Sequence, residues 1–163
     1  MEGQLSKRLA DIVNALPLAD GIRVLEIGCG PGAMARMISK RIGNGHILAI
    51  DRSPKAIQQA ISSSQAELET GNLSYRQVAI AEFDLGSNEQ RFDIAIAVRV
   101  GALDGRHPEI EKLSLLKIAR ALTNTGKLFI DGGNPLKERP LDEFRGLLSF
   151  LCISSFLYIS FVN

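Results

Sequence analysis

The chain has 163 residues, of which 45% are hydrophobic, and this is enough to build one domain around one apolar core. Nineteen basic and eighteen acidic residues leave a formal net charge of +1, without the positive excess typical of proteins that bind nucleic acid or anionic membranes. The first residues contain no apolar signal segment, and the two cysteines follow no metal-ligand spacing. We therefore expect a cytoplasmic protein with free thiols, no metal and no nucleic-acid or membrane partner.

Strands and helices are predicted to alternate along most of the chain. An amphipathic helix is indicated over Leu5–Leu16, where apolar residues recur at helical spacing before Pro17. The alternation that follows predicts an α/β fold, with a doubly wound, mostly parallel Rossmann-like sheet of five or six strands and helices on both faces. The predicted strands are Ile22–Ile27, His46–Ile50, Tyr75–Ile80, Phe92–Val98 and Lys127–Asp131, and the predicted helices between them are Ala33–Ile42, Lys55–Leu68 and Ile110–Leu122.

The first predicted strand ends at a glycine-rich turn. Glycines there remove the Cβ atoms that would keep a ligand from the backbone, and they permit positive φ angles. The helix that follows directs its free N–H groups at the turn, with Arg36 on its outer side. This pattern predicts a nucleotide-type cofactor site at Gly28, Cys29, Gly30 and Gly32.

An acidic residue, Glu26, lies in the otherwise apolar strand, two positions before the first glycine. A buried carboxylate is costly without a partner. Dinucleotide-binding domains normally have an apolar residue there, although the glycine spacing also fits their G-x-G-x-x-A pattern. The sequence Glu26-x-Gly28-x-Gly30-x-Gly32 resembles the first motif of the class I S-adenosylmethionine-dependent methyltransferases. The resemblance covers residues 22–131 and implies that Glu26 faces the methionine ammonium of S-adenosylmethionine, directly or through water.

A second acid, Asp51, follows the second predicted strand, 23 residues after Gly28. Ligands of doubly wound sheets bind outside the carboxyl ends of the strands, where an acid can accept two hydrogen bonds from a ribose diol. The spacing fits the adenosine of S-adenosylmethionine and that of NAD. In this interpretation Arg52 and Ser53 border the adenine. Alternatively, Asp51 only favours the start of the next helix, which Ser53 caps and Pro54 begins.

The third predicted strand brings Ala81 and Glu82 to the same edge of the sheet. The resemblance implies that residues at this place clamp the adenine amine. Ile80 stands where the family often has a first acid, so only Ala81 and Glu82 carry over. Val98, at the end of the fourth strand, completes the residues expected around the cofactor.

No catalytic signature is visible, because methyl transfer from a sulfonium chiefly requires alignment, and a base only where the attacking atom is protonated. The candidates lie at or beyond the ends of the fourth and fifth strands. His107 is a candidate base, although a lone loop histidine is more often a surface residue. Arg99 is predicted to pair with an acidic acceptor or with Asp104, and Asp131 is the remaining candidate. The Asn/Asp-Pro-Pro-Tyr turn of nucleic-acid and glutamine N-methyltransferases is missing, which argues against a nucleic-acid acceptor.

The end of the chain departs from the resembling family, which finishes with a helix, a sixth strand and an antiparallel seventh. A helix over 140–148 and a sixth strand over 156–162 leave little for a seventh, so we expect shortened or altered C-terminal strands. A homodimer through the apolar end of the chain would cover the exposed edge. The single expected domain has an N-terminal helix (1–18), a cofactor-binding core (22–131) and an atypical C-terminal segment (132–163).

Three functions are consistent with these features. The first is methyl transfer from S-adenosylmethionine to a small-molecule acceptor. The second is an NAD(P)-dependent oxidoreductase, which the glycines and Asp51 permit but Glu26 and the lack of a catalytic Tyr-Lys pair disfavour. The third is a non-catalytic protein that binds S-adenosylmethionine or a partner.

Overall fold

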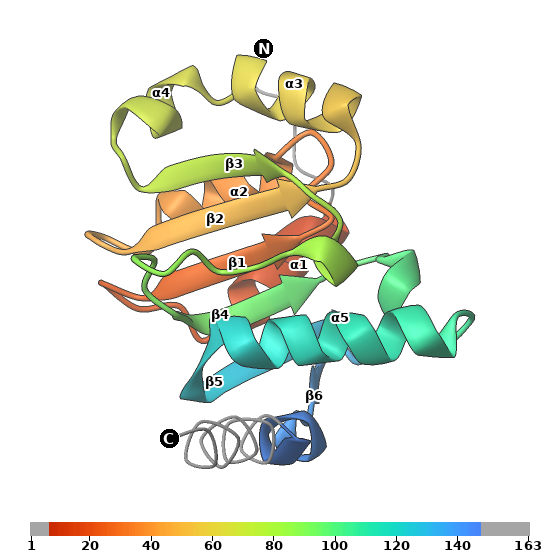
Figure 1. Ribbon diagram of the computed structural model, residues 1–163. Coiled ribbons are helices and arrows are strands. Elements are labelled where there is room, and N and C mark those ends of the chain that lie inside the picture. The colour runs from red at the N-terminus through yellow and green to blue at the C-terminus, as the bar shows by residue number, and fades with distance from the viewer. Residues whose placement is uncertain (1–6, 148–163) are drawn as a thin grey trace, which may run out of the picture.

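Six strands form one sheet in the order β3-β2-β1-β4-β5-β6 in the computed structural model, which describes residues 7–147 (Figure 1). The first five strands pair in parallel, and β6 pairs antiparallel with β5 at the edge. The predicted α/β sheet with altered C-terminal strands is therefore confirmed. The strands are β1 (Arg23–Ile27), β2 (His46–Asp51), β3 (Leu73–Gln77), β4 (Phe92–Ala97), β5 (Leu122–Asp131) and β6 (Leu136–Arg139).

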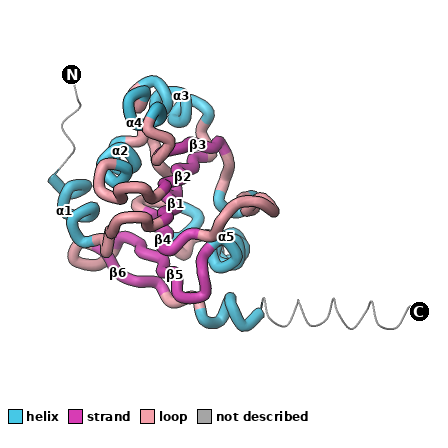
Figure 2. The backbone as a smooth tube through the Cα atoms, turned by 90° about the vertical axis from the view of Figure 1, so that its left-hand side faces the viewer, coloured by secondary structure: helices cyan, strands magenta, loops and turns pink. Residues whose placement is uncertain are grey.

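Helices cover both faces of the sheet, as Figure 2 shows for α2 on one side and α5 on the other. One buried cluster joins apolar residues of α1, α2 and α3 to the sheet, and a second joins those of α5 and η1 to the opposite face. In the central strand β1, Val24 belongs to the first cluster and Leu25 to the second. Side chains alternate along a strand, so Glu26 points to the face that α1 and α2 cover. The elements are α1 (Lys7–Ala15), α2 (Ala33–Ser39), α3 (Pro54–Ser62), α4 (Gln65–Glu69), α5 (Pro108–Ala121), η1 (Ile80–Glu82) and η2 (Gly101–Leu103).

The predicted helix Lys55–Leu68 is wrong as a single element, because it breaks between α3 and α4. Ser64 at the break is fully buried. Its hydroxyl donates to the Ala60 carbonyl at 2.6 Å and lies 2.9 Å from the Tyr75 hydroxyl on β3. A serine that satisfies its hydroxyl locally competes with regular helix, and here it also ties α3 to the sheet.

Three other boundaries differ from the prediction by three residues or more. Helix α2 ends at Ser39 rather than Ile42, and β3 covers 73–77, so that Ile80 begins the 3-10 turn η1. Strand β5 starts at Leu122, directly after α5, and the predicted turn at 124–126 lies inside it as an irregularity in the pairing with β4.

The C-terminal part of the sheet was not predicted from the sequence. Strand β6 lies in the predicted atypical segment 132–163, at residues to which no strand or helix was assigned. A helix covers 142–147, within the predicted helix 140–148. The predicted strand 156–162 and the proposed dimer contact lie outside the described residues. Among the described helices, none is long and apolar enough to cross a membrane.

Candidate functional site

The glycine turn after β1 lies at the carboxyl ends of the parallel strands, where doubly wound folds bind ligands. The backbone N–H groups of Gly28 and Cys29 both donate to the Ile50 carbonyl, at 2.8 and 3.0 Å, which fixes the turn to β2. Gly28, Gly30 and Gly32 have φ angles of 73°, 53° and 76°. The predicted positive φ angles are therefore present at all three glycines.

The three glycines are needed for different reasons. A Cβ on Gly32 would lie 2.2 Å from the Tyr75 hydroxyl, and one on Gly28 would lie 2.9 Å from the Val100 side chain. A Cβ on Gly30 would meet no atom within 4 Å. The backbone of Gly30 is therefore open to a ligand. Gly28 and Gly32 are needed instead because any larger residue would clash with the side chains of Val100 and Tyr75.

Asp51 holds the turn from β2. One carboxylate oxygen, Oδ2, accepts from the Gly30 N–H at 2.9 Å, and the other, Oδ1, accepts from the Ser53 N–H at 2.8 Å. Each carboxylate oxygen has a second lone pair for a further donor. Asp51 is half-buried. Asp51 therefore orders the start of α3 and still presents acceptors at the sheet edge, while its contact with a ribose stays a prediction.

Arg36 braces the turn from α2, which the sequence analysis missed. It is half-buried, not on the solvent side as predicted. Its guanidinium Nη1 donates to the Pro31 carbonyl at 2.9 Å and to the Ser64 hydroxyl at 3.2 Å. The helical periodicity of the sequence predicts only which residues face the sheet. It carries no information about a neighbouring loop, so it could not predict the contact between Arg36 and the glycine turn.

Glu26 is 1% exposed, and its Oε2 has no hydrogen-bond partner within residues 7–147. Burial raises the pKa of its carboxyl from the ordinary 4.5 to about 8, while the Arg36 charge opposes this rise and the Asp51 charge adds to it. A buried acid without a hydrogen-bond partner lowers the stability of the fold unless a ligand supplies the missing partner.

Glu26 lines a cavity of about 190 Å³ between β1, α1 and the glycine turn. Cys29 is buried there, and burial followed by the negative charges of Glu26 and Asp51 raises the pKa of its thiol, so it stays protonated. This cofactor-side cavity is lined by Arg8, Leu9, Glu26, Gly28, Cys29, Pro31, Ala33, Met34, Val98 and Arg99.

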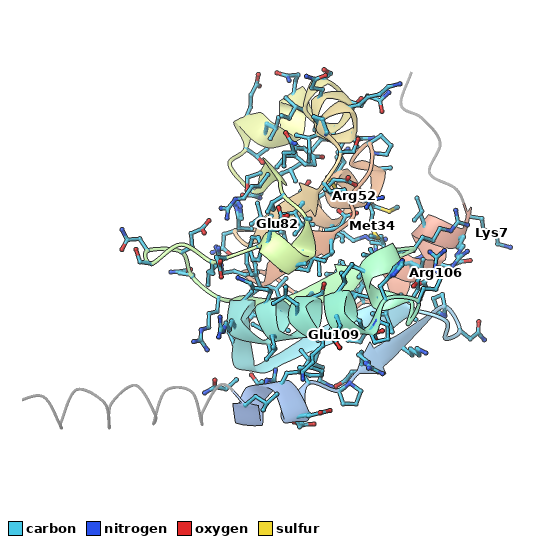
Figure 3. The ribbon with its side chains drawn as sticks, turned by 45° about the vertical axis from the view of Figure 1, so that its right-hand side comes forward. Lys7, Met34, Arg52, Glu82, Arg106 and Glu109 are labelled. Atoms are coloured by element: carbon cyan, nitrogen blue, oxygen red, sulfur yellow. The ribbon has the colours of Figure 1, made fainter. Side chains whose placement is uncertain are left out.

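The residues predicted around the adenine follow neighbouring strands. Arg52 comes directly after β2, and Glu82 lies in η1 after β3 (Figure 3). Ala81 precedes Glu82 in η1, so all three are at the edge of the sheet that carries the glycine turn. Arg52 and Glu82 are exposed. None of the three lines the cofactor-side cavity, so an adenine contact by them stays a prediction.

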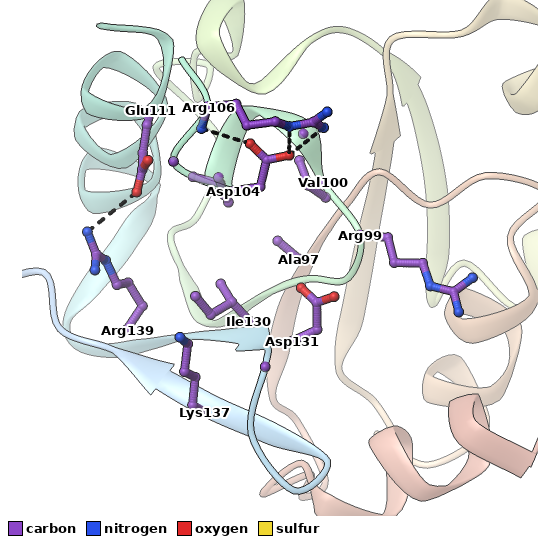
Figure 4. A pocket seen from close by; sticks show the side chains of 14 residues that line it. Ala97, Arg99, Val100, Asp104, Arg106, Glu111, Ile130, Asp131, Lys137 and Arg139 are labelled. Carbon is purple, nitrogen blue, oxygen red and sulfur yellow. Dashed lines mark hydrogen bonds and ion pairs between the residues drawn. The ribbon is translucent and has the colours of Figure 1, made fainter. Parts of the chain in front are cut away.

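A second cavity, of about 610 Å³, lies beyond the ends of β4 and β5 and is bordered by β6 (Figure 4). We call it the outer cavity. Arg99 lines both cavities, which makes them neighbours. The outer cavity is lined by Ala97, Arg99, Val100, Gly101, Leu103, Asp104, Gly105, Arg106, Glu111, Ile130, Asp131, Gly132, Lys137 and Arg139.

The catalytic candidates have different surroundings in the structure. Asp104 pairs with Arg106 rather than Arg99, with 2.7 Å between Oδ2 and Nε, and this contact lowers the pKa of Asp104 and weakens it as a proton acceptor. Asp131 lies 3.6 Å from Arg8 of α1. His107 is exposed, directly before α5, and lines neither cavity. Its position gives no support to a role as a base.

Comparison with known proteins shows the family to which this fold belongs. A family model described as a methyltransferase domain matches residues 18–148. The chain belongs to this methyltransferase family. Its fold is that of the class I enzymes, whose cofactor is S-adenosylmethionine. Membership of a methyltransferase family argues against the alternative prediction of an NAD(P)-dependent oxidoreductase. Within residues 7–147, no group of His, Cys, Asp and Glu could hold a metal ion.

The relatives of this chain differ in what their names say they act on. Ribosomal RNA small subunit methyltransferase C of Vibrio parahaemolyticus is 32% identical over 87% of this chain and 39% of the relative. Ubiquinone biosynthesis O-methyltransferase of Alkalilimnicola ehrlichii is 33% identical over 53% of this chain and 33% of the relative. The chain thus spans less than half of either relative, and the two names differ in the class of molecule that is methylated.

A solved structure supports the same fold. The S-adenosylmethionine-dependent methyltransferase of Thiobacillus denitrificans, in complex with S-adenosyl-L-homocysteine, superimposes with a TM-score of 0.60 at 23% identity. The match covers 77% of this chain and 48% of that chain. This likeness concerns the fold alone.

Proposed function

We propose that this chain binds S-adenosylmethionine at the glycine turn and directs its methyl group to a small-molecule acceptor. The observation that carries the proposal is Glu26, a buried carboxylate with an unpaired oxygen in a cavity beside the turn. An ammonium group is the ligand that compensates a buried carboxylate best, because it supplies both charge and hydrogen bonds.

The remaining contacts follow from the positions of the residues. Asp51 accepts from a ribose diol, and the lone pairs that it keeps while it holds Gly30 support this contact. The bare Gly30 backbone admits close approach of the cofactor. Arg52 and Glu82 extend the site along the sheet edge toward the adenine end. The 190 Å³ cavity then receives the methionine end.

S-adenosylmethionine supplies a sulfonium methyl group that is already activated for displacement. The chain contributes position, because it holds an acceptor in the neighbouring cavity and in line with that methyl. Arg99, at the junction of the two cavities, marks where the methyl group and the acceptor meet. The outer cavity, at about 610 Å³, has the size of a small-molecule site, which supports a small acceptor over a macromolecule.

The variant Asp51→Asn tests the cofactor site. It keeps one acceptor oxygen and loses the charge, so we expect S-adenosylhomocysteine to bind about tenfold or more weakly in isothermal titration calorimetry. Asp142→Asn changes an exposed aspartate in the helix 142–147 and serves as the matched control, with unchanged affinity expected. Equal affinities for both variants and the unchanged protein, or tighter binding of NAD, would overturn the proposed site.

A further inference from the structure

We propose that the outer cavity selects a small acceptor that carries an anionic group, a carboxylate or a phosphate, and that Lys137 of β6 holds this group. The inference rests on the proposed function, since it names the acceptor class of that site. It follows from three observations: the direction of the β6 side chains, the pairing of charges around the cavity, and the position of Arg99.

Strand β6 directs Lys137 into the outer cavity. In the antiparallel register, Lys137 stands opposite Ile130 and Arg139 opposite Leu128. Directly opposed residues place their side chains on the same face of a sheet. Ile130, Lys137 and Arg139 all line the outer cavity, whereas Glu138, on the other face, pairs with Lys127 at 2.9 Å. The strand that sequence analysis missed therefore supplies two cations to the outer cavity.

The carboxylates around the outer cavity are already paired. Asp104 contacts Arg106 at 2.7 Å, Glu111 lies 3.5 Å from Arg139, and Asp131 lies 3.6 Å from Arg8. No carboxylate within residues 7–147 pairs with the two remaining cations of the lining, which are Arg99 and Lys137. The outer cavity thus contains an uncompensated positive charge that a ligand anion can neutralise.

The position of Arg99 indicates which end of such an acceptor faces the cofactor-side cavity. It has a φ of 57°, and among the described residues other than glycine no other φ is positive. A positive φ is uncommon for a residue other than glycine, and such residues cluster at active sites and ligand-binding sites. Figure 4 shows Arg99 and Lys137 on opposite sides of Asp131. Since Arg99 also lines the cofactor-side cavity, the reactive atom belongs at the Arg99 end and the anion at the Lys137 end.

The apolar part of the lining suits the body of such a molecule. Ala97, Val100, Leu103 and Ile130 also line the outer cavity. A molecule with a short apolar body and one terminal anion would therefore satisfy the whole lining.

Binding of matched probe pairs to the protein saturated with S-adenosylhomocysteine tests the inference. The pairs are benzoate with benzamide and phenyl phosphate with phenol, titrated by ligand-observed NMR. We expect at least one anion to bind about tenfold more tightly than its neutral partner, and Lys137→Gln to remove that preference. The pair that shows the preference identifies carboxylate or phosphate as the anion.

Lys112→Gln is the matched control, because Lys112 is an exposed lysine of α5 outside the lining. Neutral probes that bind as well as anions, or a preference that survives Lys137→Gln, would overturn the inference while S-adenosylhomocysteine binding stays intact. Lys137-dependent binding of a short RNA in place of both small anions would also overturn it. Failure of S-adenosylhomocysteine to bind at all would instead refute the proposed function, and the acceptor inference with it.

Discussion

The variant Gly32→Val is expected to lose about 3 kcal/mol of unfolding free energy and all measurable S-adenosylhomocysteine binding. Its Cβ would lie 2.2 Å from the Tyr75 hydroxyl and 3.0 Å from Ala60, at a φ of 76°. The Tyr75 hydroxyl is held by the buried Ser64, so it has little freedom to withdraw. Urea unfolding and calorimetry measure the two effects.

Gly30→Ala provides the contrast within the same turn. Its Cβ would meet no protein atom within 4 Å, so we expect only the cost of a positive φ, about 1 kcal/mol. The added methyl group points to the place where the cofactor is proposed to contact the Gly30 backbone. We therefore expect cofactor affinity to fall about tenfold although the protein still folds. A Gly32→Val protein as stable as the unchanged one would contradict this account of the turn.

The variant Glu26→Gln is expected to reduce S-adenosylhomocysteine affinity at pH 8.5 by about 30-fold, because it removes the charge that pairs with the ammonium. The same variant should be more stable than the unchanged protein at that pH. Glu26 has a pKa of about 8 in the folded protein and an ordinary value of 4.5. The contribution of Glu26 to the free energy of unfolding is therefore fully present below pH 4.5 and is lost as the pH rises through 8. Over this range the free energy of unfolding falls by up to about 1.4 kcal/mol per pH unit.

Glu109→Gln is a suitable control for the effect on binding. Glu109 is an exposed acid in the first turn of α5 that lines neither cavity, so its change should leave cofactor affinity unaltered. A Glu26→Gln protein that binds S-adenosylhomocysteine normally at pH 8.5 would show that Glu26 is only a buried acid of the core.

The sequence was sufficient for the parts of the fold that local patterns determine. Apolar runs such as 92–98 mark parallel strands buried on both faces, and the glycine turn with Glu26 marks the site at their carboxyl ends. The observed β4 and the three positive φ angles agree with those patterns. Membership of the methyltransferase family agrees with the resemblance carried by the same motif.

Features that depend on contacts between distant segments were missed. The break at Ser64 follows from its bond to Tyr75 on β3, and the role of Arg36 follows from its bond to Pro31. Strand β6 is short, and three of its four residues, 137–139, are charged, so its sequence resembles a loop. Its place beside β5 depends on register, which hydrophobic patterning alone does not specify for an exposed edge.

The charge state of Glu26 on cofactor binding tests the central claim most directly. We would titrate the protein with S-adenosylhomocysteine between pH 6 and 8 in buffers of different ionisation enthalpy. If a protonated Glu26 has to ionise to receive the ammonium, binding releases close to one proton at pH 6 to 7, and affinity rises up to about tenfold per pH unit toward pH 8. Affinity that is independent of pH, with no proton released, would contradict the account.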